Sequence, residues 1–267
     1  MKKLAGTMLK CVGFFICWAM FAAALPMPEI ESPAMWRLWA EIVPLAAIVM
    51  FTFLFWLIEK KSVKLHLWDN PRKGIPIGTA AGIVWLGSTV AIMLLANIIT
   101  FEGSNPVPML GVWLLAAFLN VIMQELLVRG YLYQMLKQKY NGIAAVIVTT
   151  ALFTLLHGGA FEAGVIPVLN VLTMSLLMTA VLEYTGSLIA PTIMHFLWNG
   201  IGALILDGVS LAEDYPHLLN MAFSENVILS GGACKMEGSM IVLLVNASLL
   251  SIFLFLQKKQ EKVFCIR

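Results

Sequence analysis

The stretch VIMQELLVRG, residues Val121–Gly130, places two charged side chains inside a long apolar run. A charged side chain in hydrocarbon costs about 2.5–3.5 kcal/mol on insertion scales. Glu125 and Arg129 are four residues apart, so on a helix they share a face and can form an ion pair that lowers the cost of burying both. Gln124 adds a third polar group. This pattern indicates a functional site, and the alternative is an ion pair that only fixes helix packing.

The composition around this stretch is that of a polytopic membrane protein. Of 267 residues, 60% are hydrophobic and 12% are charged, whereas a soluble globular protein has about 25% charged residues. We therefore expect membrane lipid as a partner and no nucleic acid. The four cysteines are scattered without a CxxC spacing, so the sequence predicts neither a disulfide scaffold nor a cysteine-based zinc site.

Apolar runs separated by polar or proline-rich breaks predict an all-α fold with about eight transmembrane helices. In chain order they are 11–25, which residues from Leu4 onward extend, and then 38–58, 75–99, 107–137, 142–157, 165–183, 188–206 and 240–256. The first run also fits a signal peptide, with small residues at Ala22–Ala24, but seven further spans favour a retained helix. Thr100–Pro106 is expected to be a short polar turn, and Asp207–Ser239 is the longest predicted loop.

Two further patterns concern packing and orientation. Gly74, Gly78 and Gly82 have the small-xxx-small spacing that lets membrane helices approach closely. Eight spans place both termini on one side, and the basic residues predict that this side is the cytoplasm of a multi-pass cell-membrane protein. The basic residues assigned to that side are Lys2, Lys3, Lys10, Lys60, Lys61, Lys64, Arg72, Lys73, Lys137, Lys139, Lys258, Lys259, Lys262 and Arg267.

Two more polar clusters lie in apolar spans. Phe153–His157, FTLLH, ends the fifth span, and His195–Asn199, HFLWN, lies inside the seventh. His195 and Asn199 are four residues apart, so one helix face presents both. A packed, hydrogen-bonded histidine is the alternative interpretation of each cluster.

QELLVRG, FTLLH and HFLWN, in this order on separate apolar helices, resemble the three motifs of the CAAX-protease and bacteriocin-processing family: EExxxR, FxxxH, and HxxxN or HxxxD. The resemblance covers about Leu110–Gly202. That family comprises intramembrane endopeptidases, including the type II CAAX prenyl endopeptidases and bacterial members linked to bacteriocin immunity. The resemblance implies hydrolysis of a peptide bond in a membrane-associated or peptide substrate by an activated water, at a site between helices 4, 5 and 7.

The resemblance also assigns roles. A motif-one carboxylate, here Glu125, and His157 would hold and activate the water, while His195 and Asn199 would stabilise the oxyanion. Arg129 would orient the carboxylate, with Gln124 and Phe153 as supporting residues. Two histidines and a carboxylate could also hold zinc, through Glu125, His157 and His195. The family has been described both as metalloproteases and as metal-independent glutamate proteases, and both mechanisms stay open.

Gln124 departs from the family pattern, because it replaces the first Glu of EExxxR. An amide cannot take a proton, so either Glu125 is the base, or Gln124 only positions water, or catalysis is lost. The rival functions are an inactive membrane partner, for example a bacteriocin-immunity protein, and a small-solute transporter. No inverted repeat or pair of broken helices favours the transporter.

On this interpretation the chain has four segments. Residues 1–105 hold helices 1–3, and residues 106–206 form a CAAX-protease-like core of helices 4–7. Residues 207–239 are an outer loop, and residues 240–267 are the last helix and a basic tail.

Overall fold

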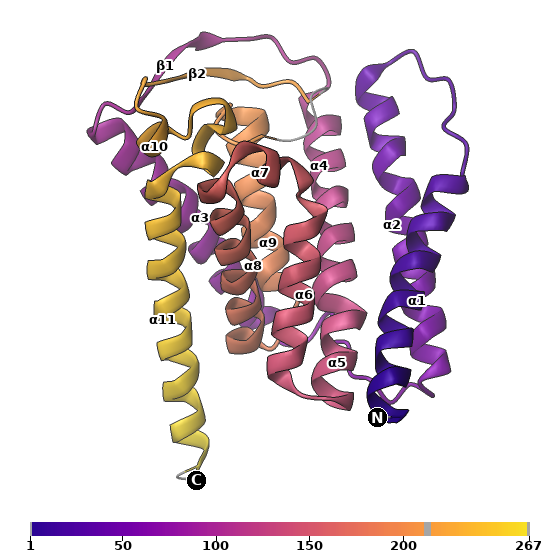
Figure 1. Cartoon of the computed structure of the whole chain (residues 1–267). Helices are drawn as coiled ribbons and strands as arrows, with labels where there is room; N and C mark the ends of the chain where they lie inside the picture. Colours follow the sequence, from indigo (N-terminus) through magenta and orange to yellow (C-terminus); the bar gives the residue numbers. More distant parts are fainter. Residues whose placement is uncertain (1, 211–214, 266–267) are drawn as a thin grey trace. The chain divides into compact units, whose positions relative to one another are not determined.

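The structure is a computed structural model that describes residues 2–210 and 215–265. Its helices are α1 (Lys2–Ala24), α2 (Pro33–Ile58), α3 (Pro71–Leu95), α4 (Leu110–Glu125), α5 (Tyr133–Lys139), α6 (Gly142–Leu156), α7 (Gly158–Ala163), α8 (Val165–Thr185), α9 (Ile189–Phe196), α10 (Val227–Ser230) and α11 (Met240–Cys265) (Figure 1). Three further helical segments are the π-helices η1 (Leu126–Leu132) and η2 (Leu197–Ile205) and the 3-10 helix η3 (Gly232–Gly238).

The all-α, polytopic membrane fold is confirmed. Within the described residues, six helices are long and apolar enough to cross a membrane: Gly6–Ala24, Pro33–Ile58, Pro71–Leu95, Leu110–Lys139, Val165–Thr185 and Gly232–Gln260. The predicted fifth and seventh spans are shorter apolar helices, Gly142–Leu156 and Ile189–Ile205. The count of eight spans therefore stays a prediction.

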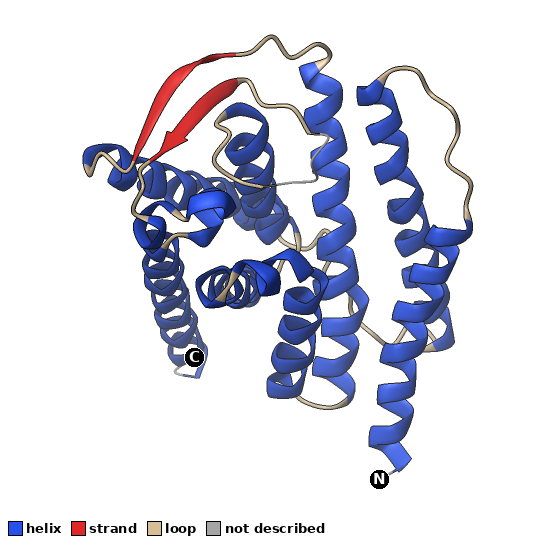
Figure 2. Cartoon of the chain, turned by 45° about the horizontal axis from the view of Figure 1, so that its top comes forward, coloured by secondary structure: helices blue, strands red, loops and turns tan. Residues whose placement is uncertain are grey.

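The expected turn at Thr100–Pro106 is wrong for most of its length. Ile99–Ser104 forms strand β1, which pairs antiparallel with strand β2, Leu219–Phe223, inside the predicted outer loop (Figure 2). The register places Ile99 opposite Phe223 and Ser104 opposite Leu219. Short polar segments look like turns when read locally, and a strand becomes evident only when its distant partner is known.

The chain divides into two compact units, each built from two segments. Unit 1 comprises residues 1–67 and 108–149, and unit 2 comprises residues 68–107 and 150–267. The placement of one unit relative to the other is not determined. These units follow internal contacts, whereas the four predicted segments follow the motifs, so the predicted segmentation stays a prediction.

Aromatic side chains hold the helices of unit 1 together. Phe14 of α1 is fully buried, with its ring 5.3 Å from that of Phe55 of α2 and 4.8 Å from that of Tyr131 of η1. Phe55 and Tyr131 also meet edge to face, with ring centroids 5.6 Å apart. Such pairs add to the apolar burial that fixes three helices around the charged stretch.

Small residues allow the close packing of α3 on α9 in unit 2. A Cβ at Gly78 would lie 2.5 Å from the carbonyl oxygen of Ala190, and one at Gly82 would lie 2.7 Å from Cδ1 of Leu197. A Cβ at Gly74 would lie 3.0 Å from Oγ of Ser187. The close approach predicted from the glycine spacing is therefore confirmed, and it positions the helix that carries His195.

Candidate active site

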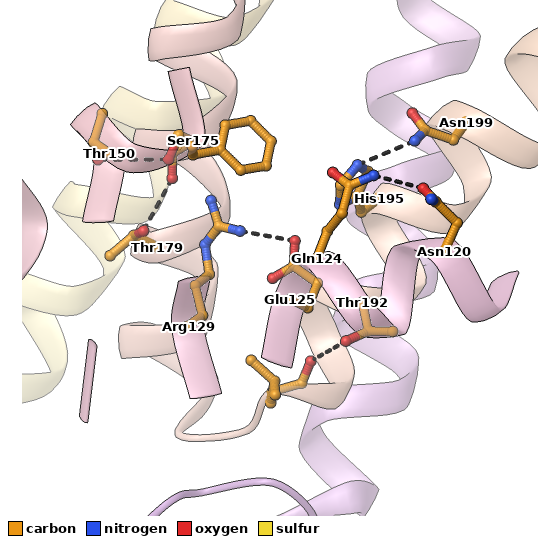
Figure 3. A network of polar contacts seen from close by, with 12 residues as sticks. Asn120, Gln124, Glu125, Arg129, Thr150, Ser175, Thr179, Thr192, His195 and Asn199 are labelled. Atoms are coloured by element: carbon orange, nitrogen blue, oxygen red, sulfur yellow. Dashed lines mark hydrogen bonds and ion pairs between the residues drawn. The ribbon is translucent and has the colours of Figure 1, made fainter. Parts of the chain in front are cut away.

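Glu125 and Arg129 form the ion pair that their spacing predicts. Arg129 Nη1 donates to Glu125 Oε1 across 2.7 Å, and both side chains are 0% exposed (Figure 3). Glu125 is the last residue of α4, and Arg129 lies one turn later in η1. A short charge-assisted bond of this kind compensates part of the cost of burying two charges.

A second polar chain in unit 1 reaches Gln124. Gln124 Nε2 donates to Asn120 Oδ1 across 2.5 Å, and Asn120 Nδ2 donates to Glu41 Oε2 across 2.8 Å. Arg37 Nη1 lies 3.4 Å from Glu41 Oε1. Asn120 and Glu41 were not predicted from the sequence, although each had a signal: Glu41 is a carboxylate in an apolar span, and Asn120 is one turn before Gln124.

In unit 2, the backbone fixes which nitrogen of His157 carries the proton. His157 follows the end of α6, and its Nδ1 lies 2.7 Å from the carbonyl oxygen of Phe153. A carbonyl oxygen only accepts, so Nδ1 must donate, and Nε2 of the neutral ring is then an acceptor. This contact orients imidazoles that act as general bases and imidazoles that bind metals.

His195 and Asn199 also form a pair. Asn199 Nδ2 lies 3.2 Å from Nε2 of His195, and both side chains are buried. In this orientation of the amide, Asn199 donates to Nε2 and the proton of a neutral His195 is on Nδ1. The pair therefore offers N–H donors for an oxyanion without introducing a formal charge.

Phe153 brings motifs two and three together within unit 2. Its ring centroid lies 4.4 Å from that of His157 and 6.0 Å from that of His195. Phe153 is buried and has His157 and His195 as ring neighbours, so its supporting role is spatial. The predicted convergence of His157 and His195 with Glu125 joins different units and stays a prediction.

Both i,i+4 pairs cross a junction between an α-helix and a π-helix. Glu125 ends α4 and Arg129 lies in η1, while His195 lies in α9 and Asn199 in η2. π-Helical turns in α-helices occur frequently at functional sites. Apolar periodicity did not predict them, because one extra residue per turn barely changes a pattern in which almost every position is apolar.

Across the described ranges 2–210 and 215–265, no group of three or more His, Cys, Asp and Glu side chains is arranged to hold a metal ion. The acceptor nitrogen of His157 has the chemistry of a zinc ligand. The ligand set Glu125, His157 and His195 stays a prediction, because it joins the two units.

Comparison with known proteins places these motifs in a family. Residues 106–201 match the family model described as Type II CAAX prenyl endopeptidase Rce1-like, and this range contains all three motifs. The curated proteins and the solved structures contain no match to the chain. The resemblance carried by QELLVRG, FTLLH and HFLWN is thereby confirmed. Residues 106–201, which carry the three motifs, are similar to the Rce1-like type II CAAX prenyl endopeptidases of the CAAX-protease family.

Proposed function

We propose that this membrane protein is a CAAX-type intramembrane endopeptidase that hydrolyses a peptide bond in a membrane-associated or peptide substrate. The observation that carries the proposal is the state of His157. Its Nδ1–H is bound to the Phe153 carbonyl, so its Nε2 is a proton acceptor, and the Phe153 ring contacts both His157 and His195. Holding one tautomer with an acceptor nitrogen suits a group that activates water for hydrolysis.

The proposed reaction uses each polar residue once. The oxygen of a water held by His157 attacks the scissile carbonyl carbon, and the water's proton passes to the Glu125 carboxylate, which Arg129 orients. His195 and Asn199 donate hydrogen bonds to the oxyanion that develops. When the C–N bond breaks, the proton on Glu125 passes to the leaving amine. A zinc ion, if bound, would supply Lewis-acid polarisation at the same place.

Gln124 favours a second candidate function. An amide in the position of the family's first Glu cannot accept a proton, which fits a catalytically inactive member that binds a membrane partner, for example in bacteriocin immunity. The two functions differ in one measurable property, the cleavage of a peptide bond by the unmodified chain.

The test is cleavage of candidate membrane peptides by the purified protein in liposomes, with and without a chelator. Glu125→Gln and His157→Ala should each lower the rate by about 10²–10⁴-fold, as expected for loss of a general base. Glu59→Gln is the matched control, because Glu59 is a buried carboxylate paired with Lys10 and does not belong to the motifs.

Each other outcome contradicts part of the proposal. An inactive unmodified protein that gains activity in Gln124→Glu would show a natural inactive member. Activity that survives Glu125→Gln but not His157→Ala would assign the base elsewhere. Loss of activity with chelator, reversed by zinc, would establish the metal mechanism.

We also propose that both termini face the cytoplasm, on the support of the basic residues. A cysteine introduced at Ser62 or at Glu225, in a background without the four native cysteines, reports the side of each segment. Both positions are exposed. An impermeant reagent applied to intact cells should label Glu225→Cys and leave Ser62→Cys unlabelled, and the reverse pattern would contradict the orientation.

A further inference from the structure

Four side chains in unit 1 form one continuous hydrogen-bonded chain that ends at Gln124. Starting from α2, Arg37 contacts Glu41, Glu41 accepts from Asn120, and Asn120 accepts from Gln124. Glu41 is 5% exposed and lies within the apolar span Pro33–Ile58. Burying a carboxylate costs free energy. Its presence here, with two hydrogen-bonding partners, indicates a role beyond packing.

The chemistry of a carboxylate fixes both amides in this chain. An ionised Glu41 only accepts, so Asn120 must present its NH2 group to it. The Asn120 carbonyl oxygen is then the atom that faces Gln124, which must present its own NH2 group in turn. Neither amide can flip without placing two donors or two acceptors against each other. Glu41 therefore sets the orientation of the Gln124 amide through the intervening Asn120.

Within the described part of the protein, this orientation leaves the carbonyl oxygen of Gln124 as the one acceptor of the hydrogen-bonded chain without a donor. Gln124 Oε1 is buried, and among the residues that the structure describes it has no hydrogen-bond partner. A buried acceptor left unsatisfied costs about as much as a lost hydrogen bond, so such an atom is expected to bind a donor in the working protein. Gln124 directly precedes Glu125, the residue proposed as the base.

We infer that Glu41 and Asn120 are positioning residues that hold Gln124 as an obligate hydrogen-bond acceptor for the attacking water. This inference rests on the proposed function for its catalytic consequence. Glu125 takes one hydrogen of the water, and the second hydrogen lies between two acceptors, His157 Nε2 and Gln124 Oε1, so that Gln124 helps to orient the water without removing a proton. The substitution of Gln for Glu in motif one is then a change of role, from base to orienting group.

The orientation of Asn120 determines whether a carboxylate at position 124 has a hydrogen-bond donor. In Gln124→Glu the new carboxylate faces Asn120 Oδ1, so two acceptors oppose each other. In Glu41→Gln/Gln124→Glu the residue at 41 presents its NH2 group to Asn120, Asn120 reverses, and its NH2 group meets the carboxylate at 124. The same partner change corrects Asn120→Asp, whose second carboxylate oxygen would otherwise face Glu41.

Thermal unfolding of the full chain in detergent tests the chain of contacts without any substrate. Gln124→Glu and Asn120→Asp should each lower the melting temperature by roughly 2–10 °C, as expected for opposed buried acceptors. Adding Glu41→Gln to either should restore most of that loss. Adding Glu59→Gln, which removes another buried carboxylate of unit 1, should restore none of it. Additive effects in both cycles would overturn the inference even if the protein is an active protease.

Kinetics then test the positioning role with an active preparation. Asn120→Asp should lower kcat by about 10²-fold with KM unchanged, since misplacing a reacting group by about 1 Å costs on this order. Asn120→Asp/Glu41→Gln should recover kcat. A rise in KM with kcat unchanged would show that Gln124 binds substrate and not the water, and unchanged kinetics in Asn120→Asp would remove Asn120 from the mechanism.

Discussion

The Glu125–Arg129 pair of unit 1 and the His195–Asn199 pair of unit 2 have the same backbone design and opposite chemistry. Each joins residues four apart across the start of a π-helix, and each is buried. The first pair is charged and has an N–O distance of 2.7 Å, while the second pairs an imidazole with an amide at 3.2 Å. In both pairs the π-helical turn positions the side chains, whereas their charge determines the chemistry that each pair can support.

The two pairs should also differ in what they cost to break. A buried ion pair that loses one partner leaves an uncompensated charge, whereas an imidazole that loses an amide leaves one polar atom to be satisfied by water. Perturbing unit 1 should therefore act first on folding, and perturbing unit 2 should act first on catalysis.

The largest effect is expected for Arg129→Met. It leaves Glu125 without its guanidinium, and breaking a buried pair in this way costs about 3–5 kcal/mol of unfolding free energy. Thermal or denaturant unfolding in detergent measures the loss. Glu125→Gln/Arg129→Met should be clearly more stable than Arg129→Met. Lys10→Met, which removes a partner that is 42% exposed, should cost about 1 kcal/mol or less. Equal losses for Arg129→Met and Lys10→Met would break the comparison.

The next effect is expected for Asn199→Ala. Loss of one oxyanion donor lowers kcat by about 10²–10³-fold, while stability should fall by only about 1–2 kcal/mol. Paired measurements of kcat and melting temperature separate the two effects. A loss of stability as large as that of Arg129→Met, with activity retained in the folded fraction, would refute a catalytic role.

Glycine substitutions are expected to have an intermediate effect on stability, and they compare the packing of the two units. Gly78→Ala places a methyl group 2.5 Å from the Ala190 carbonyl oxygen, so it should cost about 1–3 kcal/mol and displace α9. Gly130→Ala, beside Arg129, meets its nearest atom at 3.5 Å and should be tolerated. Gly87→Ala is the control within α3, because nothing lies within 4 Å of its Cβ. Melting temperatures of the three variants test whether the close approach of two helix backbones makes only the glycine of unit 2 at the α3–α9 contact intolerant of a methyl group.

The smallest effect concerns the ion pair between Glu59 and Lys10 in unit 1, which we call the edge pair. Burial raises the pKa of this carboxyl, but the hydrogen bond and charge of Lys10, together with the charge of Lys139, outweigh it and lower the pKa below 4.5. The folded state therefore favours the ionised form, and its contribution is present above pH 4.5 and is lost as pH falls below it.

Unfolding measured against pH in the unmodified protein and in Glu59→Gln detects this contribution. The difference between the two proteins should shrink by about 1 kcal/mol or less as pH falls through the acidic range, because one partner is partly exposed. A difference that grows on acidification would contradict the sign. The edge pair would then resemble neither of the two motif pairs.

Local spacing in the sequence was enough to predict several features of these regions. The four-residue interval predicted the Glu125–Arg129 pair, and the glycine interval predicted the close approach of α3 to a partner helix. The order of three short motifs identified the family, which the match over residues 106–201 confirms. In each of these cases the information lies within one helix turn or in the order of motifs.

The features that were missed depend on contacts between distant segments or on subtle backbone geometry. Glu41 meets Asn120 only after α2 packs on α4, and no spacing along the chain relates them. Strand β1 depends on β2 in the same way. The π-helices depend on which carbonyl each N–H selects, and an apolar sequence satisfies both choices.

The interleaving of the two units has a consequence for biogenesis. Unit 1 ends at residue 149, whereas unit 2 begins at residue 68 and needs residues up to the C-terminal part of the chain. During synthesis, β1 must therefore wait for β2, and Ile99 has no strand partner until Phe223 has been translated. Because domains generally fold as units and N-terminal ones first, we expect unit 1 to mature on the ribosome while unit 2 is still incomplete. The acidic half of the proposed catalytic apparatus would then be assembled before unit 2, which carries both membrane histidines, is complete.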